Sequence, residues 1–168
     1  MTVVMEAPIR QSATMARIGD PAPALTAATT QREITFTDDY PGTWVILFSH
    51  LADFTPVCTS EFTTFASVED QFAAYDTALA DLSVDGLYSP IAWLRTIKDK
   101  IEHRGMNDVE VAFPLIEDLA IVVARTYAMI MTGEDSTKAV RAVSVIDPKG
   151  IPARSSTSSA GTSGSYCA

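Results

Sequence analysis

One cysteine of this chain stands where its sulfur could act as a nucleophile. Cys58 follows an apolar run over residues 44–48 and opens an amphipathic helical pattern, so it lies where a strand gives way to a helix. Thr55 is a good N-cap residue and Pro56 suits the first helical position, which places Cys58 in the first turn. The N–H groups of that turn and the partial positive charge of the helix N-terminus favour a thiolate over a thiol.

Two interpretations of Cys58 follow from its position. In the first, the thiolate is reactive, and the Thr55 hydroxyl with the N–H groups of Val57 and Cys58 holds a small oxygen-bearing ligand against the sulfur. In the second, Cys58 is buried and inert, which is the commoner role of a lone cysteine. Position alone does not decide between the two interpretations.

The predicted strands and helices that would position this sulfur alternate through the middle of the chain. Apolar and alternating patterns predict strands over 33–37, 44–49, 78–84, 111–116 and 139–146. Helices are predicted over 55–75 and 89–104, and a third should begin after a cap at Asp118. The alternation indicates an α/β domain, and the apolar strand 44–49 suits a sheet covered by helices.

The two ends of the chain differ from this middle part. Residues 1–14 lack the pattern of a signal or transit peptide and are interpreted as a disordered extension, which leaves one domain over residues 15–151. Residues 147–150, with the sequence DPKG, predict a type I turn. Beyond that turn, Pro152 lacks a ladder donor, and residues 152–168 have the Ser/Thr/Gly content of a low-complexity tail. No strand or helix is therefore predicted after the turn.

Composition and charge exclude several classes of function. The 168 residues are 47% hydrophobic, enough for one core, but no apolar run is long enough to span a membrane. The formal net charge of −9 argues against nucleic-acid or anionic-membrane partners. Two cysteines make no disulfide framework, so a reducing, cytoplasmic location is predicted. Neither a zinc-ligand spacing nor a glycine-rich phosphate loop occurs, so no metal and no cofactor is predicted.

Residues 49–61, SHLADFTPVCTSE, resemble the active-site segment of the peroxiredoxins, whose one-cysteine subgroup has the pattern SHPADFTPVCTTE. Further similar segments occur in family order at 18–23, 82–85, 92–93, 113–116, 140–141 and 146–150. The resemblance covers about residues 15–151. It implies a thioredoxin-like α/β fold, with a mixed central sheet flanked by helices, whose C-terminal strand and helix are expected to be missing here.

The resemblance also implies an activity, that of a thiol-dependent peroxidase, an oxidoreductase with an antioxidant role in cell redox homeostasis. Such an enzyme reduces hydrogen peroxide and small alkyl hydroperoxides, needs no cofactor, and is regenerated by an external thiol of the glutathione or thioredoxin type. A homodimer is a further expectation from the family. The alternative hypothesis is a degenerate, non-enzymatic thioredoxin-like module for redox sensing or interaction.

By resemblance, Cys58 is the peroxidatic cysteine that becomes a sulfenic acid. Thr55 matches the threonine that orients peroxide and sulfur, although helix capping alone would also explain it. Arg141 matches the arginine beside the sulfur, where a permanent positive charge would lower the thiol pKa and hold the peroxide. Without the resemblance, Arg141 is only a polar residue in a strand.

Three supporting residues complete the expected site. Glu61 matches the acid that positions the arginine, His50 matches the subgroup's histidine near the cysteine, and Val57 would supply a backbone N–H. Each has an ordinary structural explanation as well: a surface carboxylate, a paired polar group at a strand end, and a first-turn residue.

The chain departs from the family pattern at several positions. Leu51 stands where the active-site motif has proline, Pro90 stands where the subgroup has a histidine, and a second family arginine has no match in the tail. Residues 41–45 do not match a lipase-type serine motif of some members, so no phospholipase activity is predicted. Cys167 has three interpretations: a resolving cysteine, an interchain disulfide partner, or an incidental thiol.

Overall fold

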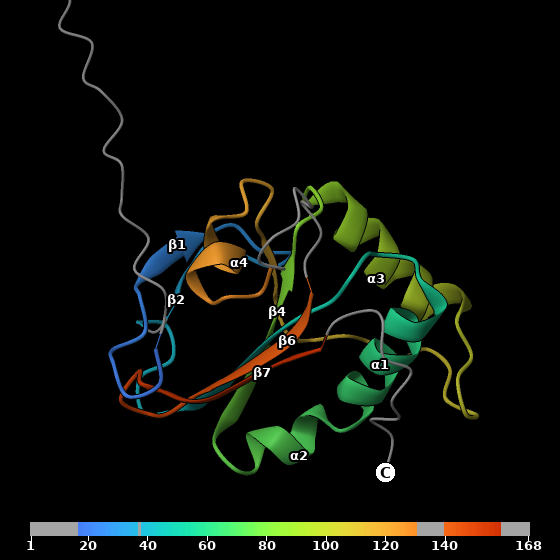
Figure 1. The fold of residues 1–168 in the computed structure, drawn as a ribbon. Helices are drawn as coiled ribbons and strands as arrows, with labels where there is room; N and C mark the ends of the chain where they lie inside the picture. The colour runs from blue at the N-terminus through green and yellow to red at the C-terminus, as the bar shows by residue number, and fades with distance from the viewer. Residues whose placement is uncertain (1–16, 37, 131–139, 159–168) are drawn as a thin grey trace, which may run out of the picture.

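The computed structural model describes residues 17–36, 38–130 and 140–158 (Figure 1). The strands are β1 (Leu25–Ala27), β2 (Ile34–Phe36), β3 (Trp44–Ser49), β4 (Thr77–Ser83), β5 (Leu115–Glu117), β6 (Arg141–Ile146) and β7 (Pro152–Ser158). The helices are α1 (Pro56–Ser67), α2 (Glu69–Ala73), α3 (Tyr88–Lys100) and α4 (Val122–Thr126). The predictions for residues 1–14 and for Cys167 lie outside the described residues.

The strand that precedes the cysteine lies at the centre of the main sheet. The sheet has five strands in the order β5-β4-β3-β6-β7, and β3 runs parallel to β4 and antiparallel to β6. β4 is parallel to β5, while β1 and β2 form a separate antiparallel ribbon. The predicted α/β fold with a mixed central sheet flanked by helices is therefore confirmed.

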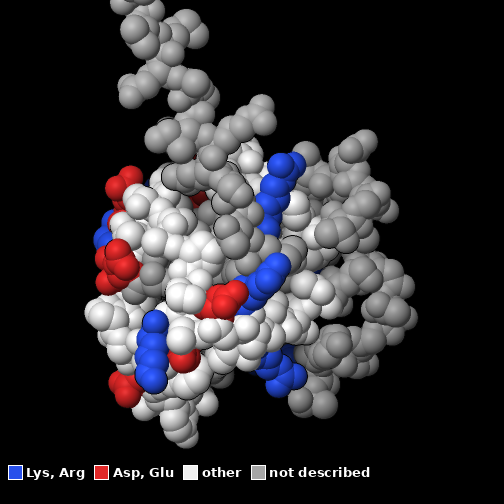
Figure 2. All heavy atoms as spheres, turned by 60° about the vertical axis from the view of Figure 1, so that its left-hand side comes forward, with Lys and Arg blue, Asp and Glu red and all other residues white. Residues whose placement is uncertain are grey.

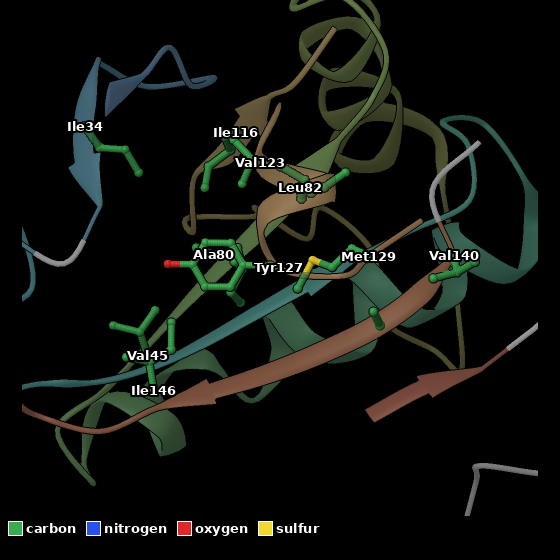
Figure 3. Packing of buried hydrophobic residues seen from close by; sticks show 13 residues of the cluster. Ile34, Val45, Ala80, Leu82, Ile116, Val123, Tyr127, Met129, Val140 and Ile146 are labelled. Atoms are coloured by element: carbon green, nitrogen blue, oxygen red, sulfur yellow. The ribbon is translucent and has the colours of Figure 1, made fainter. Parts of the chain in front are cut away.

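A hydrophobic core lies on each face of this sheet. Because successive strand residues point to opposite faces, Leu47 belongs to one core and Phe48 to the other. The first core packs under α4 and is drawn in Figure 3. The second, called the Phe48 core, packs under α1 and α3; its buried members are Phe48, Cys58, Phe62, Leu79, Trp93, Ile97, Phe113 and Leu115. The cysteine is thus part of a packed aromatic core.

Two predicted helices have different limits in the structure. The helix predicted over 55–75 is interrupted at Val68, whose φ of −117° and ψ of 8° lie outside the helical region, and resumes as α2. The helix predicted over 89–104 begins at Tyr88 and ends at Lys100. Ile101 after it has the extended φ and ψ of −98° and 124°, so the helix ends before the predicted boundary.

Asp118 binds the first N–H groups of the next helix as predicted, but α4 begins later than expected, at Val122, with Ile121 at the N-cap position. The Asp118 carboxylate accepts the N–H groups of Val122 at 2.7 Å, Val123 at 3.1 Å and Ala124 at 2.6 Å, which satisfies the first donors of α4. The strand predicted over 111–116 forms only at its end, as β5.

The prediction that no strand follows the turn at 147–150 is wrong. The turn forms as expected, and β7 returns antiparallel to β6. Pro152 is tolerated because it is the first residue of an edge strand, where a missing donor costs little, and a bulge in β7 at Ala153 adjusts the register beside it. The main sheet therefore continues to Ser158, past residue 151. The absence of a C-terminal helix stays a prediction, since residues 159–168 are not described.

The charged side chains are scattered rather than gathered. On the described part of the face in Figure 2, blue Lys and Arg side chains stand singly or beside red Asp and Glu side chains, without a continuous basic stripe. Over residues 17–36, 38–130 and 140–158, no helix has both the length and the apolar character needed to cross a membrane.

Candidate active site

The sulfur lies where the chain passes from β3 into α1. Pro56 occupies the start of α1, and Thr55 before it is extended, with φ −82° and ψ 142°. Phe54 has a φ of 59°, a left-handed conformation that is unusual for a bulky residue and turns the chain into the helix. This turn tucks the Cys58 side chain under the helix, where it has no exposed surface.

A guanidinium from the neighbouring strand reaches this sulfur. β6 pairs with β3 so that Ala142 faces Ser49, which brings Arg141 beside the end of β3. Arg141 Nη2 donates to Cys58 Sγ over 3.7 Å, and Arg141 Nη1 donates to Glu61 Oε1 over 3.1 Å. The expected proximity of Arg141, Glu61 and the sulfur is therefore present in the fold.

The Thr55 hydroxyl does not cap the helix. It donates instead to the carbonyl oxygen of Ala52 over 3.0 Å, and the N-terminus of α1 has no side-chain cap. The same hydroxyl lowers the Cys58 pKa when its hydrogen is turned to the sulfur instead, as described next. Plain capping therefore does not explain Thr55, and its orienting role stays a prediction.

The thiol pKa of Cys58 is lowered from its ordinary value. Burial by itself raises this pKa, because a charged sulfur loses solvation. Four groups together outweigh burial: the Thr55 hydroxyl, the backbone N–H groups of Leu51 and Ala52, and the positive charge on His50. The N–H of Leu51 is notable, because the proline found there in the family pattern has no such donor.

His50 lies on the inner side of the same site. Its Nδ1 is 2.8 Å from Asp81 Oδ2 and its Nε2 is 2.8 Å from Asp53 Oδ1. Its ring packs against those of Phe62 and Trp93, with centroids 5.3 and 5.0 Å away. Burial lowers the pKa of His50, but the two carboxylates outweigh it and raise the pKa to about 10.

Asp53 and Asp81 are the site residues that sequence reasoning missed. Burial raises the pKa of the Asp81 carboxyl, against the opposing effect of the His50 charge. The only signal in the sequence was an acidic residue within the apolar pattern of the strand predicted over 78–84. Nothing in the sequence marked Asp53 as a site residue, apart from its position within the active-site motif.

Three buried side-chain atoms of the described residues lack a hydrogen-bond partner, and all three belong to this region. They are Arg141 Nε, Asp53 Oδ2 and Asp81 Oδ1. Unpaired buried polar atoms are costly, and they concentrate at functional sites. The Nε–H of Arg141, whose Nη2 contacts the sulfur, is thus a donor still available to a ligand.

The remaining expected residues are less closely engaged. Val57 is at the start of α1 and is 52% exposed as a residue, and its proposed N–H contact stays a prediction. Leu51 packs its side chain against the Phe48 core. Two hollows of the described surface are lined by other residues, so neither of them is an open pocket at Cys58. Among described residues, no three His, Cys, Asp or Glu side chains are arranged to hold a metal ion.

Comparison with known proteins gives a consistent set of relatives. A peroxiredoxin of Methanosarcina mazei is 56% identical over 135 residues, which cover 80% of this chain and 62% of that protein. A peroxiredoxin of Aquifex aeolicus is 47% identical over 135 residues, covering 80% of this chain and 58% of that protein. The chain thus spans about three fifths of the length of these curated relatives.

Two solved structures show the same fold. The yeast mitochondrial 1-Cys peroxiredoxin matches with a TM-score of 0.73 and 38% identity, covering 86% of this chain and 68% of that one. A mutant of Peroxiredoxin 6 from Arenicola marina matches with a TM-score of 0.74 and 26% identity, covering 87% and 66%. The model of the AhpC/TSA family matches residues 18–153, which include Cys58, Thr55 and Arg141. The chain, with its one-cysteine peroxiredoxin relatives, therefore belongs to the AhpC/TSA family.

Proposed function

We propose that this chain is a thiol-dependent peroxidase that uses Cys58 to reduce hydroperoxides. The observation that carries the proposal is the 3.7 Å contact of Arg141 Nη2 with Cys58 Sγ at the first turn of α1. A lowered thiol pKa supplies the thiolate, which is the nucleophilic form of sulfur. The alternative of a non-enzymatic module is not favoured, because that role would not require these groups to converge on one sulfur.

The reaction is a displacement at oxygen. The Cys58 thiolate attacks the nearer oxygen of the hydroperoxide, an S–O bond forms, and the O–O bond breaks. The leaving oxygen takes both electrons of that bond and a proton, and departs as water or an alcohol. Cys58 is thereby oxidised to a sulfenic acid, and the peroxide is reduced.

Arg141 stabilises the charge that develops during this step. Two of its guanidinium nitrogens are engaged, one with the sulfur and one with Glu61, while the buried Nε has no partner among the described residues. Fixed donors aimed at developing negative charge supply much of the rate enhancement in enzymes. The Nε–H is suited to hold a peroxide oxygen while the Nη2–H holds the sulfur.

Thr55 has one hydroxyl hydrogen and more than one acceptor for it. It donates to Ala52 in this structure, and its oxygen lone pairs remain able to accept. A bound hydroperoxide carries an O–H that can donate to this oxygen. Thr55 would then orient the substrate by accepting this O–H, while its own hydrogen goes to the Ala52 carbonyl or to the sulfur.

The covered sulfur limits the size of the substrate. Cys58 has no exposed surface, whereas the Arg141 and Glu61 side chains beside it are 33% and 42% exposed. A substrate therefore enters from the Arg141 side, by displacing side chains rather than by filling an open pocket. This arrangement favours hydrogen peroxide and small alkyl hydroperoxides over bulky ones.

Peroxide consumption in the presence of dithiothreitol tests the proposal. Cys58→Ser should abolish thiol-dependent consumption, since a hydroxyl cannot replace a thiolate at neutral pH. The matched control is Cys167→Ser, which removes the chain's other cysteine and should retain the activity. Equal consumption by wild-type protein and Cys58→Ser would refute the proposal.

An external thiol completes the cycle. The sulfenic acid of Cys58 condenses with one thiol to a mixed disulfide and water, and a second thiol releases the cysteine. In the yeast mitochondrial 1-Cys peroxiredoxin, thiol resolution proceeds via glutathione and thioredoxin systems. We propose a reductant of the same two classes here, in a reducing, cytoplasmic setting. Turnover with glutathione, or with thioredoxin and its reductase, in place of dithiothreitol distinguishes them.

A homodimer is part of the proposal. Among the described strands, β7 lies at the edge of the sheet and pairs with β6 alone, and the side chains of residues 153–157 are exposed along it. An edge with unpaired backbone groups is suited to pairing with another strand. Light scattering after size-exclusion chromatography should give twice the chain mass, and a monomer mass at micromolar concentration would contradict it.

A further inference from the structure

A second polar cluster lies inside the site and is not used by the proposed reaction. His50, Asp53 and Asp81 form a line in which each ring nitrogen of His50 is 2.8 Å from one carboxylate oxygen. Their side chains are 3%, 2% and 0% exposed, so all three are fully buried. Buried ionisable groups are expensive and need a reason to persist. We call this set the buried triad.

The geometry of the triad fixes how many protons it holds. A neutral imidazole has one N–H, and its other nitrogen can only accept. Both nitrogens of His50 face carboxylate oxygens, which also only accept when ionised. Both contacts are therefore satisfied only if the triad carries one further proton, and with that proton on the ring His50 is an imidazolium between two carboxylates. The direction of the His50 pKa agrees with this count.

The imidazolium is placed where it can act on the sulfur. His50 follows β3 directly, and its ring lies between Phe62 of α1 and Trp93 of α3. Trp93 Nε1 in turn donates to Thr59 Oγ1 over 3.1 Å, one residue after Cys58. The ring is thus fixed against the first turns of the helix that carries the cysteine.

The triad also fixes the loop between β3 and α1. Asp53 belongs to this loop, and its bond to His50 restrains the segment that carries Ala52, Phe54 and Thr55. The same segment supplies the hydroxyl and the N–H groups that act on the sulfur. Phe54 keeps its unusual φ of 59° within it, so the loop must be restrained from both sides.

We propose that Asp81 is a positioning residue for the peroxidatic thiolate, acting through His50. Asp81 belongs to β4, touches neither the sulfur nor the substrate, and has no other charged neighbour than His50 and Asp53 among the residues described in this region. It holds His50 in the doubly protonated form, and His50 in turn stabilises the Cys58 thiolate and holds Asp53 and the loop in place. The proposal deepens the proposed function and rests on it for its catalytic consequence.

The charged groups around the sulfur set the sign of the expected effect. Arg141 and Glu61 lie on its outer side, from β6 and α1, while His50, Asp53 and Asp81 lie on its inner side, from the loop and β4. Asp81→Asn keeps the side-chain shape and one acceptor but removes a charge. His50 then loses its proton at lower pH, and the Cys58 thiolate loses a nearby positive charge.

The test measures the thiol pKa of Cys58 by the pH dependence of its alkylation with iodoacetamide. All variants carry Cys167→Ser, so that one thiol is read. Asp81→Asn should raise the pKa by about one unit, the lower end of what a neighbouring charge does, and slow alkylation about tenfold below that pKa. The matched control is Asp76→Asn, an exposed residue before β4 whose φ of 49° asparagine also adopts. It should leave the pKa unchanged.

A second measurement keeps the proposal testable if Asp81→Asn does not fold. The chain has two histidines, so the His103→Gln protein gives a single histidine signal in nitrogen NMR. His50 should remain an imidazolium at pH 8. A neutral His50 at that pH, or an unchanged thiol pKa in folded Asp81→Asn, overturns the proposal. Neither readout depends on peroxide consumption, so an inactive wild-type protein would refute the proposed function and leave this test standing.

Discussion

The two sides of the Cys58 sulfur are held by opposite physical means. On the outer side, Arg141 and Glu61 form an ion pair of 3.1 Å whose side chains are 33% and 42% exposed. On the inner side, the buried triad has exposures of 3%, 2% and 0%. Half-exposed pairs contribute little to stability, since solvent screens them, whereas a buried charge left without its partner is strongly destabilising.

This difference indicates that the half-exposed outer pair is the part of the site that can move, and that the buried triad is the part that holds the site in place. The outer groups can shift to admit a substrate at small cost, because water replaces the contacts that they lose. The inner groups shift only at high cost, because they are buried away from the solvent that would replace their contacts. Variants on the outer side should therefore lose activity at nearly constant stability, and variants on the inner side should lose both.

His50→Leu should have the largest effect on the comparison. It leaves Asp53 and Asp81 buried without their shared partner, and breaking a buried pair in this way costs about 3–5 kcal/mol. The free energy of unfolding in urea at pH 7 should fall by that amount. The control is His103→Leu, which replaces the protein's other histidine in the same way. A His50→Leu protein as stable as wild type would show that the contacts of the buried triad do not stabilise the fold.

Arg141→Ala should have the next largest effect, and this effect should be on activity rather than on stability. Removing one preorganised donor of this kind lowers a rate by about 10²–10³-fold. The rate of peroxide reaction in a single turnover should fall by this factor, while the melting temperature changes little. Arg125→Ala, an exposed arginine on α4, serves as the control. If the single-turnover rate of Arg141→Ala fell by less than threefold, the outer side of the site would not contribute to the mechanism.

The pH dependence of stability should single out the inner side. The folded-state pKa of His50, about 10, lies above its ordinary 6.5, so its contribution is fully present below pH 6.5. That contribution is lost as the pH rises from 6.5 towards 10. The melting temperature of wild type should decline across this window more steeply than that of His50→Leu. Parallel curves for the two proteins would contradict the assigned protonation.

Leu51→Pro should have the smallest effect. The substitution removes the backbone N–H that helps to lower the Cys58 pKa, and it restores the residue of the family pattern. The thiol pKa should rise, and the alkylation rate of Cys58 below that pKa should fall a few fold. Leu51→Ala keeps the N–H and serves as the control. An equal Cys58 pKa in both variants would mean that the backbone N–H of residue 51 does not stabilise the thiolate.

Local chemistry in the sequence was sufficient for the nucleophile and its immediate frame. The Thr55–Pro56 pair placed the start of α1 correctly, because Pro suits that position whatever surrounds it. The apolar pattern gave β3 its observed limits. Arg141 was found only through the resemblance, since 83 residues separate it from Cys58 and the antiparallel pairing of β3 and β6 leaves no local trace.

Tertiary contacts explain what the sequence did not reveal. Asp81 looks like a misplaced polar residue in an apolar strand until the parallel register sets it beside Phe48, two residues before His50. β7 was rejected on its Ser/Thr composition and on Pro152. The tight turn before it nevertheless brings the chain back alongside β6, and ladder hydrogen bonds form without regard to side-chain polarity.

The most direct test of the proposed site is the pH at which Cys58 becomes oxidisable. Brief exposure of the Cys167→Ser protein to limiting hydrogen peroxide, followed by mass spectrometry, gives the rate of sulfenic acid formation at each pH. We expect a rate that is half-maximal below the ordinary thiol pKa of about 8.5 and constant above it. A rate that keeps rising through pH 9 would mean that neither side of the site stabilises the thiolate, and would contradict the central claim.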